Sequence, residues 1–441
     1  MVKRGFNPNT FNGLLLGAKR LKAASRFFHD GSHGLALDLR SFSIVIRGCI
    51  ERGELHKASR LLEQLEGSGR KPDVFMYTAF IHAFCKVGEV GEAERVFGKV
   101  KDVGLLPNEV TYTVMINGCF RKGLKARGFE LFDEMRGNGL IPNLYAYNTL
   151  ICQYCRDGDL VSAFELFDEM GHKDIACNVV TYNTLLLGFC RQRKLSEAQR
   201  FLDRMKKAGI RPSAATFNTL IDGFCKAGRM SKAKEMLAQM KAAGCPPNCV
   251  TYNSLIGGFS RCSNLVGVAE CYREMKERGL TPTKVTYTIL TNAFAEGNDM
   301  DKAFDMFNSM GKAGLEADVC TYGVLINGLC REGNMKDASK LFRSMLDNKL
   351  KPNDVIYNMM IYGYCREGSS YRAWRLLKEM RENGMVPNVA SYRQTARALC
   401  RDRKWEEAEA LISEMAISGF EPGDSIYRAL SNAMAETSSC T

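Results

Sequence analysis

Residues 179–213 read VVTYNTLLLGFCRQRKLSEAQRFLDRMKKAGIRPS, and this stretch is one copy of a pattern that recurs every 35 residues. Eleven consecutive copies run from Leu39 to Gly423, and we number each copy from position 1 to position 35. A fixed period of this size is typical of a solenoid, in which each repeat packs on its neighbours. Function in a solenoid is distributed along a surface, one repeat at a time.

Two positions mark the period most clearly. Proline recurs at position 34 (Pro72, Pro107, Pro142, Pro212, Pro247, Pro282, Pro352, Pro387 and Pro422). Methionine recurs at position 27 (Met135, Met170, Met205, Met240, Met275, Met310, Met345, Met380 and Met415), where helical spacing predicts a core residue.

Each copy is predicted to hold two amphipathic helices. In the copy quoted above, apolar residues from Tyr182 to Phe189 follow the i, i+3, i+4, i+7 spacing of a first helix. Polar residues 191–194 interrupt the pattern. A second helix is expected to begin at Ser196, where Ser-Glu-Ala-Gln matches a capping box, and to end at Gly209. No sustained period-two alternation predicts a strand, so the fold class is all-α, a solenoid of helix-turn-helix repeats.

The period divides the chain into three parts. Residues 39–423 form eleven tandem repeats, and residues 424–441 hold a partial repeat around Tyr427 and a tail. Residues 1–38 are predicted to be a degenerate N-terminal repeat or remnant, because Thr10-Phe11-Asn12 and the leucines after it resemble a first helix. Their basic, acid-poor composition would also suit a transit peptide.

Composition narrows the class of partner. The chain has 61 basic and 49 acidic residues, a net charge of +12, which favours a polyanion over a polycation. No run approaches the roughly 18 apolar residues of a membrane span, so a membrane is not expected as partner.

Many of the 17 cysteines also follow the period. Free cysteine behaves as a small hydrophobic residue, so we expect the recurring ones to pack between helices in a reducing compartment. Cys152 and Cys155 form a single C-x-x-C without a second pair at zinc spacing, and no metal is expected there. Position 12 carries Cys85, Cys155, Cys190, Cys225, Cys330, Cys365 and Cys400.

A strip of the first helix faces away from the core. Asn183 at position 5 and Arg191 at position 13 lie along it, about 12 Å apart at a rise of about 1.5 Å per residue. Nine copies have a cation at position 13, which predicts a track for a polyanion, and only Glu51 and Glu296 interrupt it. The nine are Lys86, Arg121, Arg156, Arg191, Lys226, Arg261, Arg331, Arg366 and Arg401.

Position 5 alternates between small polar residues. Asparagine offers a donor and an acceptor, and threonine a hydroxyl, so this column is predicted to recognise a polar partner. Gly323 and Arg393 depart from it. The other nine are Ser43, Thr78, Thr113, Asn148, Asn183, Asn218, Asn253, Thr288 and Asn358.

These features resemble the pentatricopeptide repeat family, in the P-class form built only from 35-residue repeats. The most specific motifs are VVTYNTL at residues 179–185, TFNTLIDGFCKAG at residues 216–228, and the recurring ending Gly-x-x-Pro-Asn. The resemblance extends over residues 39–423. It implies a right-handed superhelical solenoid that binds single-stranded RNA and reads one base per repeat.

The resemblance also assigns roles to positions. In the family, position 5 and position 35 of one repeat read a base, an apolar residue at position 2 packs against it, and the cation at position 13 meets the phosphate. The clearest position-2 residues are Val110, Val180, Val250, Val285 and Val355. Implied adenine readers are Thr78 with Asn108 and Thr113 with Asn143; Asn183 with Ser213 implies cytosine, and Thr288 with Asp318 implies guanine. Implied pyrimidine readers are Asn148 with Asn178, Asn218 with Asn248, Asn253 with Thr283, and Asn358 with Asn388.

The remaining repeats fit less well. Ser43 with Asp73 is a weak match to guanine, Gly323 with Asn353 lacks the first reader, and the eleventh repeat fits no pairing. The implied target is roughly 5'-GAAYCYYGNY-3', where Y is a pyrimidine and N any base.

The family resemblance implies a role in organellar RNA processing, in the mitochondrion or alternatively the plastid. Group II intron splicing is favoured over transcript stabilisation or translation. The chain is expected to be a monomer. Other RNA-processing factors are expected as partners. The alternative is a scaffold that binds proteins, because the 34-residue tetratricopeptide repeat is similar. No enzyme or cofactor is expected, since H-x-E with P-C-x-x-C, the zinc deaminase signature, is absent.

Overall fold

The computed structural model describes residues 39–69, 71–421, 423, 426–428, 430 and 431. These residues form helices and connecting turns, with no strand among them, which confirms the all-α helical-repeat solenoid. The expectations for residues 1–38 and for most of residues 424–441 lie outside this part of the chain.

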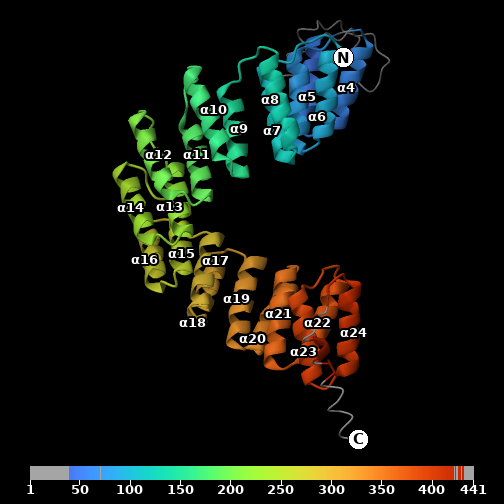
Figure 1. The fold of residues 1–441 in the computed structure, drawn as a ribbon, viewed down its shortest axis with the longest axis vertical. Coiled ribbons are helices and arrows are strands. Elements are labelled where there is room, and N and C mark those ends of the chain that lie inside the picture. The colour runs from blue at the N-terminus through green and yellow to red at the C-terminus, as the bar shows by residue number, and fades with distance from the viewer. Residues whose placement is uncertain (1–38, 70, 422, 424–425, 429, 432–441) are drawn as a thin grey trace, which may run out of the picture. The chain divides into compact units, whose positions relative to one another are not determined.

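Each of the eleven copies contributes two consecutive helices, and the chain divides into two compact units (Figure 1). The first unit contains α3 (Leu39–Glu51), α4 (Leu55–Gly67), α5 (Val74–Val87), α6 (Val90–Asp102), α7 (Glu109–Lys122), α8 (Lys125–Gly137), α9 (Leu144–Asp157), α10 (Leu160–His172), α11 (Val179–Arg191) and α12 (Leu195–Lys207). The second unit contains α13 (Ala214–Lys226), α14 (Met230–Ala242), α15 (Cys249–Arg261), α16 (Leu265–Glu277), α17 (Lys284–Glu296), α18 (Met300–Lys312), α19 (Val319–Glu332), α20 (Met335–Asp347), α21 (Asp354–Glu367), α22 (Ser370–Glu382), α23 (Val389–Arg401) and α24 (Trp405–Ile417).

The start of the second helix corrects one expectation. Helix α12 begins at Leu195, not Ser196, and its N-cap residue Lys194 makes no side-chain capping bond, so the capping box at Ser196 does not form. The physical reason is packing: Leu195 is buried, and its contacts extend the helix by a residue beyond the predicted cap. The end is as predicted, since α12 ends at Lys207 and Gly209 takes a left-handed φ of 75°.

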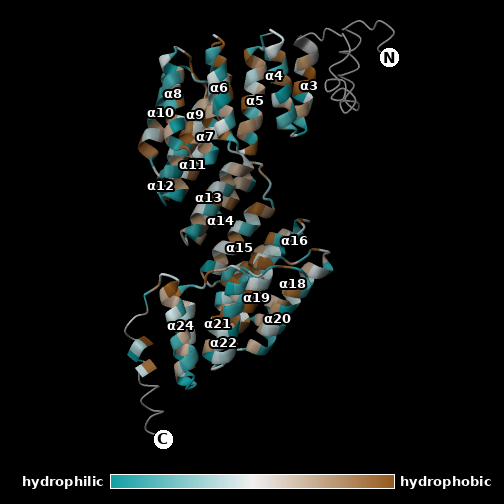
Figure 2. Cartoon of the chain, turned by 90° about the vertical axis from the view of Figure 1, so that its right-hand side faces the viewer, coloured by the Kyte–Doolittle hydropathy of each residue, from teal (hydrophilic) through white to brown (hydrophobic). Residues whose placement is uncertain are grey.

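The core lies between the two helices of each repeat and between neighbouring repeats. All nine methionines at position 27 are buried, as predicted for core residues. Position 20 is also fully buried and holds a small residue, as Ala198 does, so the two helices approach closely. Apolar and polar residues therefore share the same helices, which Figure 2 shows as adjacent brown and teal segments.

In five repeats of the described chain a tyrosine at position 4 packs against an aromatic ring of the preceding repeat. The ring of Tyr112 packs edge-on against Phe97 of the preceding repeat, with ring centroids 5.2 Å apart. Its hydroxyl donates to Glu134 Oε1 at 2.7 Å, on the second helix of its own repeat. An aromatic pair of this kind contributes about 1 kcal/mol beyond its buried area. Tyr112 therefore ties three helices together.

Glycine at position 10 brings neighbouring first helices into close contact. A Cβ atom built on Gly258 in α15 would lie 2.8 Å from both Cβ and Sγ of Cys225 in α13. Burial raises the pKa of the Cys225 thiol to about 12, so it stays a neutral packing group. The position-12 cysteines therefore pack between helices as predicted, and the sixteen cysteines of the described residues are free thiols.

This close approach predicts opposite effects at two adjacent glycines. Gly258→Ala should destabilise the protein by about 1–3 kcal/mol, because the new methyl group overpacks the contact with Cys225. Gly257→Ala is the matched control: its Cβ would lie 3.7 Å from the Arg261 side chain, an ordinary contact, so it should be neutral or stabilise by up to about 1 kcal/mol. Thermal unfolding followed by circular dichroism compares the two, and equal melting temperatures would contradict the packing role.

Candidate functional site

The position-35 side chain caps the first helix of the next repeat. Asn108 has extended backbone angles and accepts the N–H of Thr111 on its Oδ1 at 2.9 Å, at the start of α7. Asn, Asp, Ser and Thr all cap helices well, so the cap requires a polar residue but leaves its identity open. Ten first helices are capped in this way, by Asp73, Asn108, Asn143, Asn178, Ser213, Asn248, Thr283, Asp318, Asn353 and Asn388.

The structure brings position 5 and position 35 of one repeat together. In the sixth repeat, Asn218 Nδ2 donates to Asn248 Oδ1 at 3.3 Å. In the second repeat a third residue bridges the two: the hydroxyls of Thr78 and Thr111 are 2.7 Å apart, and Thr111 Oγ1 donates to Asn108 Oδ1 at 2.9 Å. The two residues that the family resemblance pairs are therefore neighbours, although they lie 30 residues apart in the sequence.

The bridging residue is at position 3 of the following repeat, and the sequence reasoning did not single it out. Thr111, Thr181, Thr216, Thr251, Thr286 and Thr321 occupy this position and are fully buried. In four first helices the position-3 threonine and the position-35 residue form a reciprocal capping box, as Asn178 and Thr181 do. The recurring spacing Asn178-x-x-Thr181 was the available signal.

Individual members of the position-5 column differ in their surroundings. Thr113 is only 4% exposed and donates to the carbonyl oxygen of Glu109 at 2.6 Å. Asn148 and Asn253 have buried Oδ1 atoms without a hydrogen-bond partner in the described structure. Gly323 is buried, and a Cβ atom there would lie 3.4 Å from the Ile356 side chain. These implied readers occupy equivalent helical positions but are not equally accessible.

In the eleventh repeat, Arg393 is exposed, and its guanidinium donates to the Glu421 carbonyl oxygen at 3.4 Å. Its Nη2 would also lie 3.6 Å from a Cβ atom built on Gly423. Position 5 and position 35 are thus neighbours here too, but they lack the pair of small polar side chains.

Position 2 forms an exposed apolar column beside these polar groups. The five valines Val110, Val180, Val250, Val285 and Val355 are 49–58% exposed. Two repeats have an aromatic residue there, Phe75 (75% exposed) and Tyr145 (57% exposed), which the sequence reasoning did not single out. An apolar side chain that recurs at one exposed position is suited to contact the flat face of a ring.

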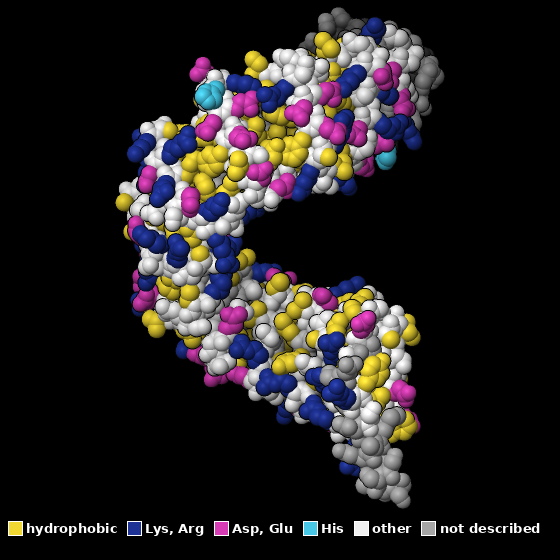
Figure 3. Space-filling view, viewed as in Figure 1, with side chains coloured by type: hydrophobic (Ala, Val, Ile, Leu, Met, Phe, Trp, Pro, Cys, Tyr) yellow, Lys and Arg dark blue, Asp and Glu magenta, His cyan; other side chains and the backbone are white. Residues whose placement is uncertain are grey.

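All nine position-13 cations are exposed, as a polyanion track requires. Arg401 donates to the carbonyl oxygen of Cys365 at 3.2 Å, and so reaches the end of the preceding first helix. Lys226 pairs with Asp222 at 2.7 Å, an exposed contact of small net energy that an incoming anion can replace. In Figure 3, Lys and Arg side chains gather over α13, α14 and α15, with apolar side chains between them.

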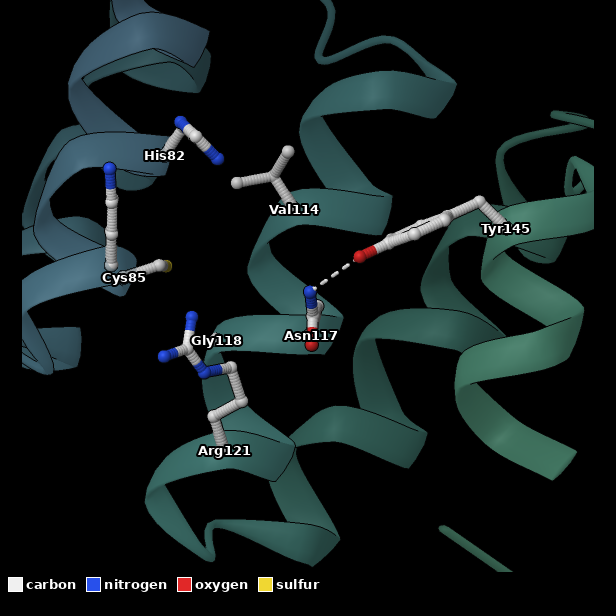
Figure 4. Close-up of a pocket in the computed structure, with 8 residues that line it drawn as sticks. His82, Cys85, Val114, Asn117, Gly118, Arg121 and Tyr145 are labelled. Carbon is white, nitrogen blue, oxygen red and sulfur yellow. Dashed lines mark hydrogen bonds between the residues drawn. The ribbon is translucent and has the colours of Figure 1, made fainter. Parts of the chain in front are cut away.

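A hollow lies between two successive cations, Lys86 of α5 and Arg121 of α7. His82, Cys85, Val114, Asn117, Gly118 and Tyr145 complete its lining. Figure 4 shows the Tyr145 hydroxyl facing Asn117, which donates to it at 2.9 Å, and Arg121 extending between α5 and α7. The lining of the hollow therefore includes a position-2 aromatic ring and two position-13 cations.

Asp318 is the acidic member of a predicted base-reading pair. Burial opposes its charge, but hydrogen bonds from the backbone N–H (3.0 Å) and the hydroxyl (3.0 Å) of Thr321 outweigh burial and lower the pKa of the carboxyl. Asp318 is therefore ionised at neutral pH and can only accept hydrogen bonds.

Among the described residues, no group of three or more His, Cys, Asp and Glu side chains is arranged to hold a metal ion. No helix in the same part of the chain has the length and apolar character needed to cross a membrane.

The capping role predicts a stability effect at Asn353, whose repeat has glycine at position 5. Asn353 Oδ1 accepts the N–H of Ile356 at 3.0 Å, so Asn353→Ala should cost about 1 kcal/mol and increase hydrogen exchange in α21. Asn353→Ser retains a capping oxygen and should stay near the wild-type stability. Equal exchange rates in all three proteins would argue against the capping role.

Sequence comparison places the same pattern in known proteins. The model of the PPR repeat family matches residues 37–86, 72–121, 142–191, 177–226, 212–261, 248–296 and 352–401. Further PPR repeat models match residues 313–346, and residues 110–140, 285–315 and 391–420. Together these matches reach all eleven copies.

Two pentatricopeptide repeat-containing proteins of Arabidopsis thaliana match part of the chain. One is 47% identical over 83 residues, which are 18% of this chain and 15% of that protein. The other is 32% identical over 89 residues, which are 20% of this chain and 18% of that protein. The alignments therefore span less than a fifth of the length of these relatives.

Solved structures of the pentatricopeptide repeat protein PPR10 have the same fold. The crystal structure of PPR10 from maize is 23% identical, with a TM-score of 0.64, and the match covers 95% of this chain and 69% of that one. PPR10 in complex with an 18-nt psaJ RNA element is 24% identical, with a TM-score of 0.76, covering 99% and 63%. Since the family model matches well over half of the residues, this chain belongs to the pentatricopeptide repeat (PPR) family.

Proposed function

We propose that this protein binds single-stranded RNA, one nucleotide per repeat, and catalyses no reaction itself. One observation carries the proposal: position 5 and position 35 of a repeat lie within hydrogen-bond reach of each other, as Asn218 and Asn248 do. They lie between an exposed apolar column and an exposed cation column. PPR10, which has the same fold, is known in complex with RNA, and this supports the choice of ligand.

Each column contacts a different part of the nucleotide. The two polar side chains hydrogen-bond to the base edge, the position-2 side chain packs on the base face, and the position-13 cation neutralises the phosphate. Val110 and Tyr145 illustrate the apolar contact. The hollow between Lys86 and Arg121 is suited to the sugar and phosphate between two bases.

The reader pairs give a proposed target of roughly 5'-GAAYCYYGNY-3'. By family likeness the protein acts in RNA processing in the mitochondrion or the plastid, with group II intron splicing as the favoured step. Holding a segment of a transcript single-stranded would prevent a misfolded structure or block a nuclease. Such a role needs only binding.

The base preference of one repeat can be exchanged. In the eighth repeat, Thr288→Asn should move the preference at the eighth nucleotide from guanine towards a pyrimidine, because an amide replaces the hydroxyl beside Asp318. Binding would be measured against synthetic RNAs that differ only at that nucleotide. Each correct contact contributes roughly 1–3 kcal/mol of discrimination, by analogy with base readout in DNA.

Thr184→Asn is the matched control for this exchange. Thr184 makes the same hydrogen bond to the carbonyl oxygen four residues earlier (2.8 Å) as Thr288 does (3.0 Å), but it lies at position 6, beside the reader column. The control should leave every base preference unchanged. An unaltered profile in the Thr288→Asn protein would refute base reading at position 5.

The cation column should act without regard to sequence. Replacing Arg156, Arg191 and Lys226 by glutamine should weaken the binding of all RNAs alike. It should also reduce the slope of log K against log salt by about 2, because each of the three phosphate contacts contributes about 0.7. As a control, replacing Arg200, Lys207 and Lys234 on the second helices by glutamine removes the same amount of charge at sites outside the column. If the slope falls equally in both triple variants, the position-13 column has no special role in binding.

A further inference from the structure

We propose that in the four repeats where it meets the position-5 side chain, the buried hydroxyl at position 3 of the following repeat is a third specificity determinant, which fixes the hydrogen-bonding direction of the base-reading side chains. The inference rests on the proposed RNA-binding function and extends it. In four repeats this hydroxyl lies directly against the position-5 side chain: Thr111 against Thr78, Thr251 against Asn218, Thr321 against Thr288 and Ser391 against Asn358, at 2.6–2.9 Å. It contacts no base itself, so it is a positioning residue.

The second repeat shows how the direction is set. The Thr78 hydroxyl is 2.7 Å from the carbonyl oxygen of Val74 and 2.7 Å from Thr111 Oγ1. Each hydroxyl has one proton, and Thr111 directs its proton to Asn108 Oδ1, so the Thr78 hydroxyl donates to Val74 or to Thr111. While these internal bonds are kept, the Thr78 proton points into the protein. Thr78 therefore presents a lone pair to the ligand and acts as an acceptor.

The same hydroxyl orients the second reader. Asn108 Oδ1 accepts both the N–H and the O–H of Thr111, each at 2.9 Å. The amide nitrogen of Asn108 is then the group left to face a ligand, as a donor. One acceptor and one donor match adenine, whose Watson–Crick edge has an amino group and a bare ring nitrogen.

The eighth repeat keeps the first reader and changes the second. Thr288 is 2.9 Å from Thr321 Oγ1 and donates to the carbonyl oxygen of Lys284, so it too faces the ligand as an acceptor. Asp318 is ionised and accepts only. Two acceptors match guanine, whose Watson–Crick edge has two neighbouring N–H donors. The implied base thus changes from adenine to guanine because the second reader changes from a donor to an acceptor.

The sixth repeat has the opposite direction at position 5. Thr251 Oγ1 donates to Asn218 Oδ1 at 2.6 Å, which occupies the amide oxygen. The Asn218 amide nitrogen gives one proton to Asn248 Oδ1 at 3.3 Å and keeps the other for a ligand, as a donor. Asn248 Oδ1 accepts the N–H of Thr251 at 3.1 Å, so its amide nitrogen also faces away from the cap. Donors suit a pyrimidine, whose O2 atom is an acceptor. Ser391 holds Asn358 in the same way.

In three repeats the residue at position 3 of the following repeat has no hydroxyl, and two of these three also lack a well-matched reader pair. The position-3 residue that follows the first, third and ninth repeats is Met76, Ala146 and Ile356, respectively. Their position-5 residues are Ser43, the nearly buried Thr113, and Gly323. Ile356 fills the space beside Gly323, so the reader and the hydroxyl are lost together. The loss of both features in the first and ninth repeats is expected if position 3 supports readout, whereas the third repeat keeps the implied adenine pair Thr113 and Asn143.

The test removes one hydroxyl and keeps the shape. Thr111→Val is nearly isosteric, and the helix cap on Asn108 survives because it uses the backbone N–H of residue 111. Binding of wild type, Thr111→Val and Thr111→Ser would be measured on four synthetic RNAs of the proposed target, with A, G, C or U at the second nucleotide. Four further RNAs varied at the sixth nucleotide report on the unaltered sixth repeat.

The expected result is a loss of adenine preference at the second nucleotide by roughly two- to tenfold in Thr111→Val, the range of one hydrogen bond. Preference at the sixth nucleotide should stay unchanged, and Thr111→Ser should restore the wild-type profile. Equal weakening for all eight RNAs, or an unchanged profile, would overturn the role of position 3 while RNA binding stands. If the wild type itself shows no preference at the second nucleotide, base reading in this repeat fails as well.

Discussion

The hydrogen bond between the position-35 side chain and the start of the next first helix underlies the rest of the structure. This bond connects the last residue of one repeat to the first turn of the next repeat, and so fixes where the first helix starts. It also places a polar side chain at the edge of the exposed strip, beside position 5 of its own repeat. A group required for folding is thereby available for recognition, since several residue types cap equally well.

Within each compact unit, close packing of the first helices extends this local bond into a surface shared by successive repeats. Glycine at position 10 lets a helix approach the cysteine of the preceding one, as Gly258 approaches Cys225. The same approach brings position 3 of one repeat against position 5 of the previous repeat. The proposed recognition unit therefore consists of side chains from two repeats, and it forms only where two repeats stack.

The columns differ in how strictly the fold constrains them. Positions 4, 20 and 27 are buried and keep one residue type almost throughout, because the core tolerates little change in volume. Positions 2 and 13 are exposed, yet in most repeats position 2 is apolar and position 13 is basic. Folding does not require apolar and basic residues at these exposed positions. A ligand that is both flat and anionic is the simpler explanation for their recurrence.

The sequence by itself determined the period, the pairing of helices, the core columns and the exposed cations, because each is a matter of spacing along one helix or of repetition. It misplaced the start of α12, where burial of Leu195 outweighs the local capping signal at Ser196. Only the tertiary structure decided that Thr111 joins Thr78 to Asn108, that Thr113 is nearly buried, and that the Ile356 side chain lies beside Gly323. These contacts connect residues of different repeats, and their distances depend on how closely two helices pack.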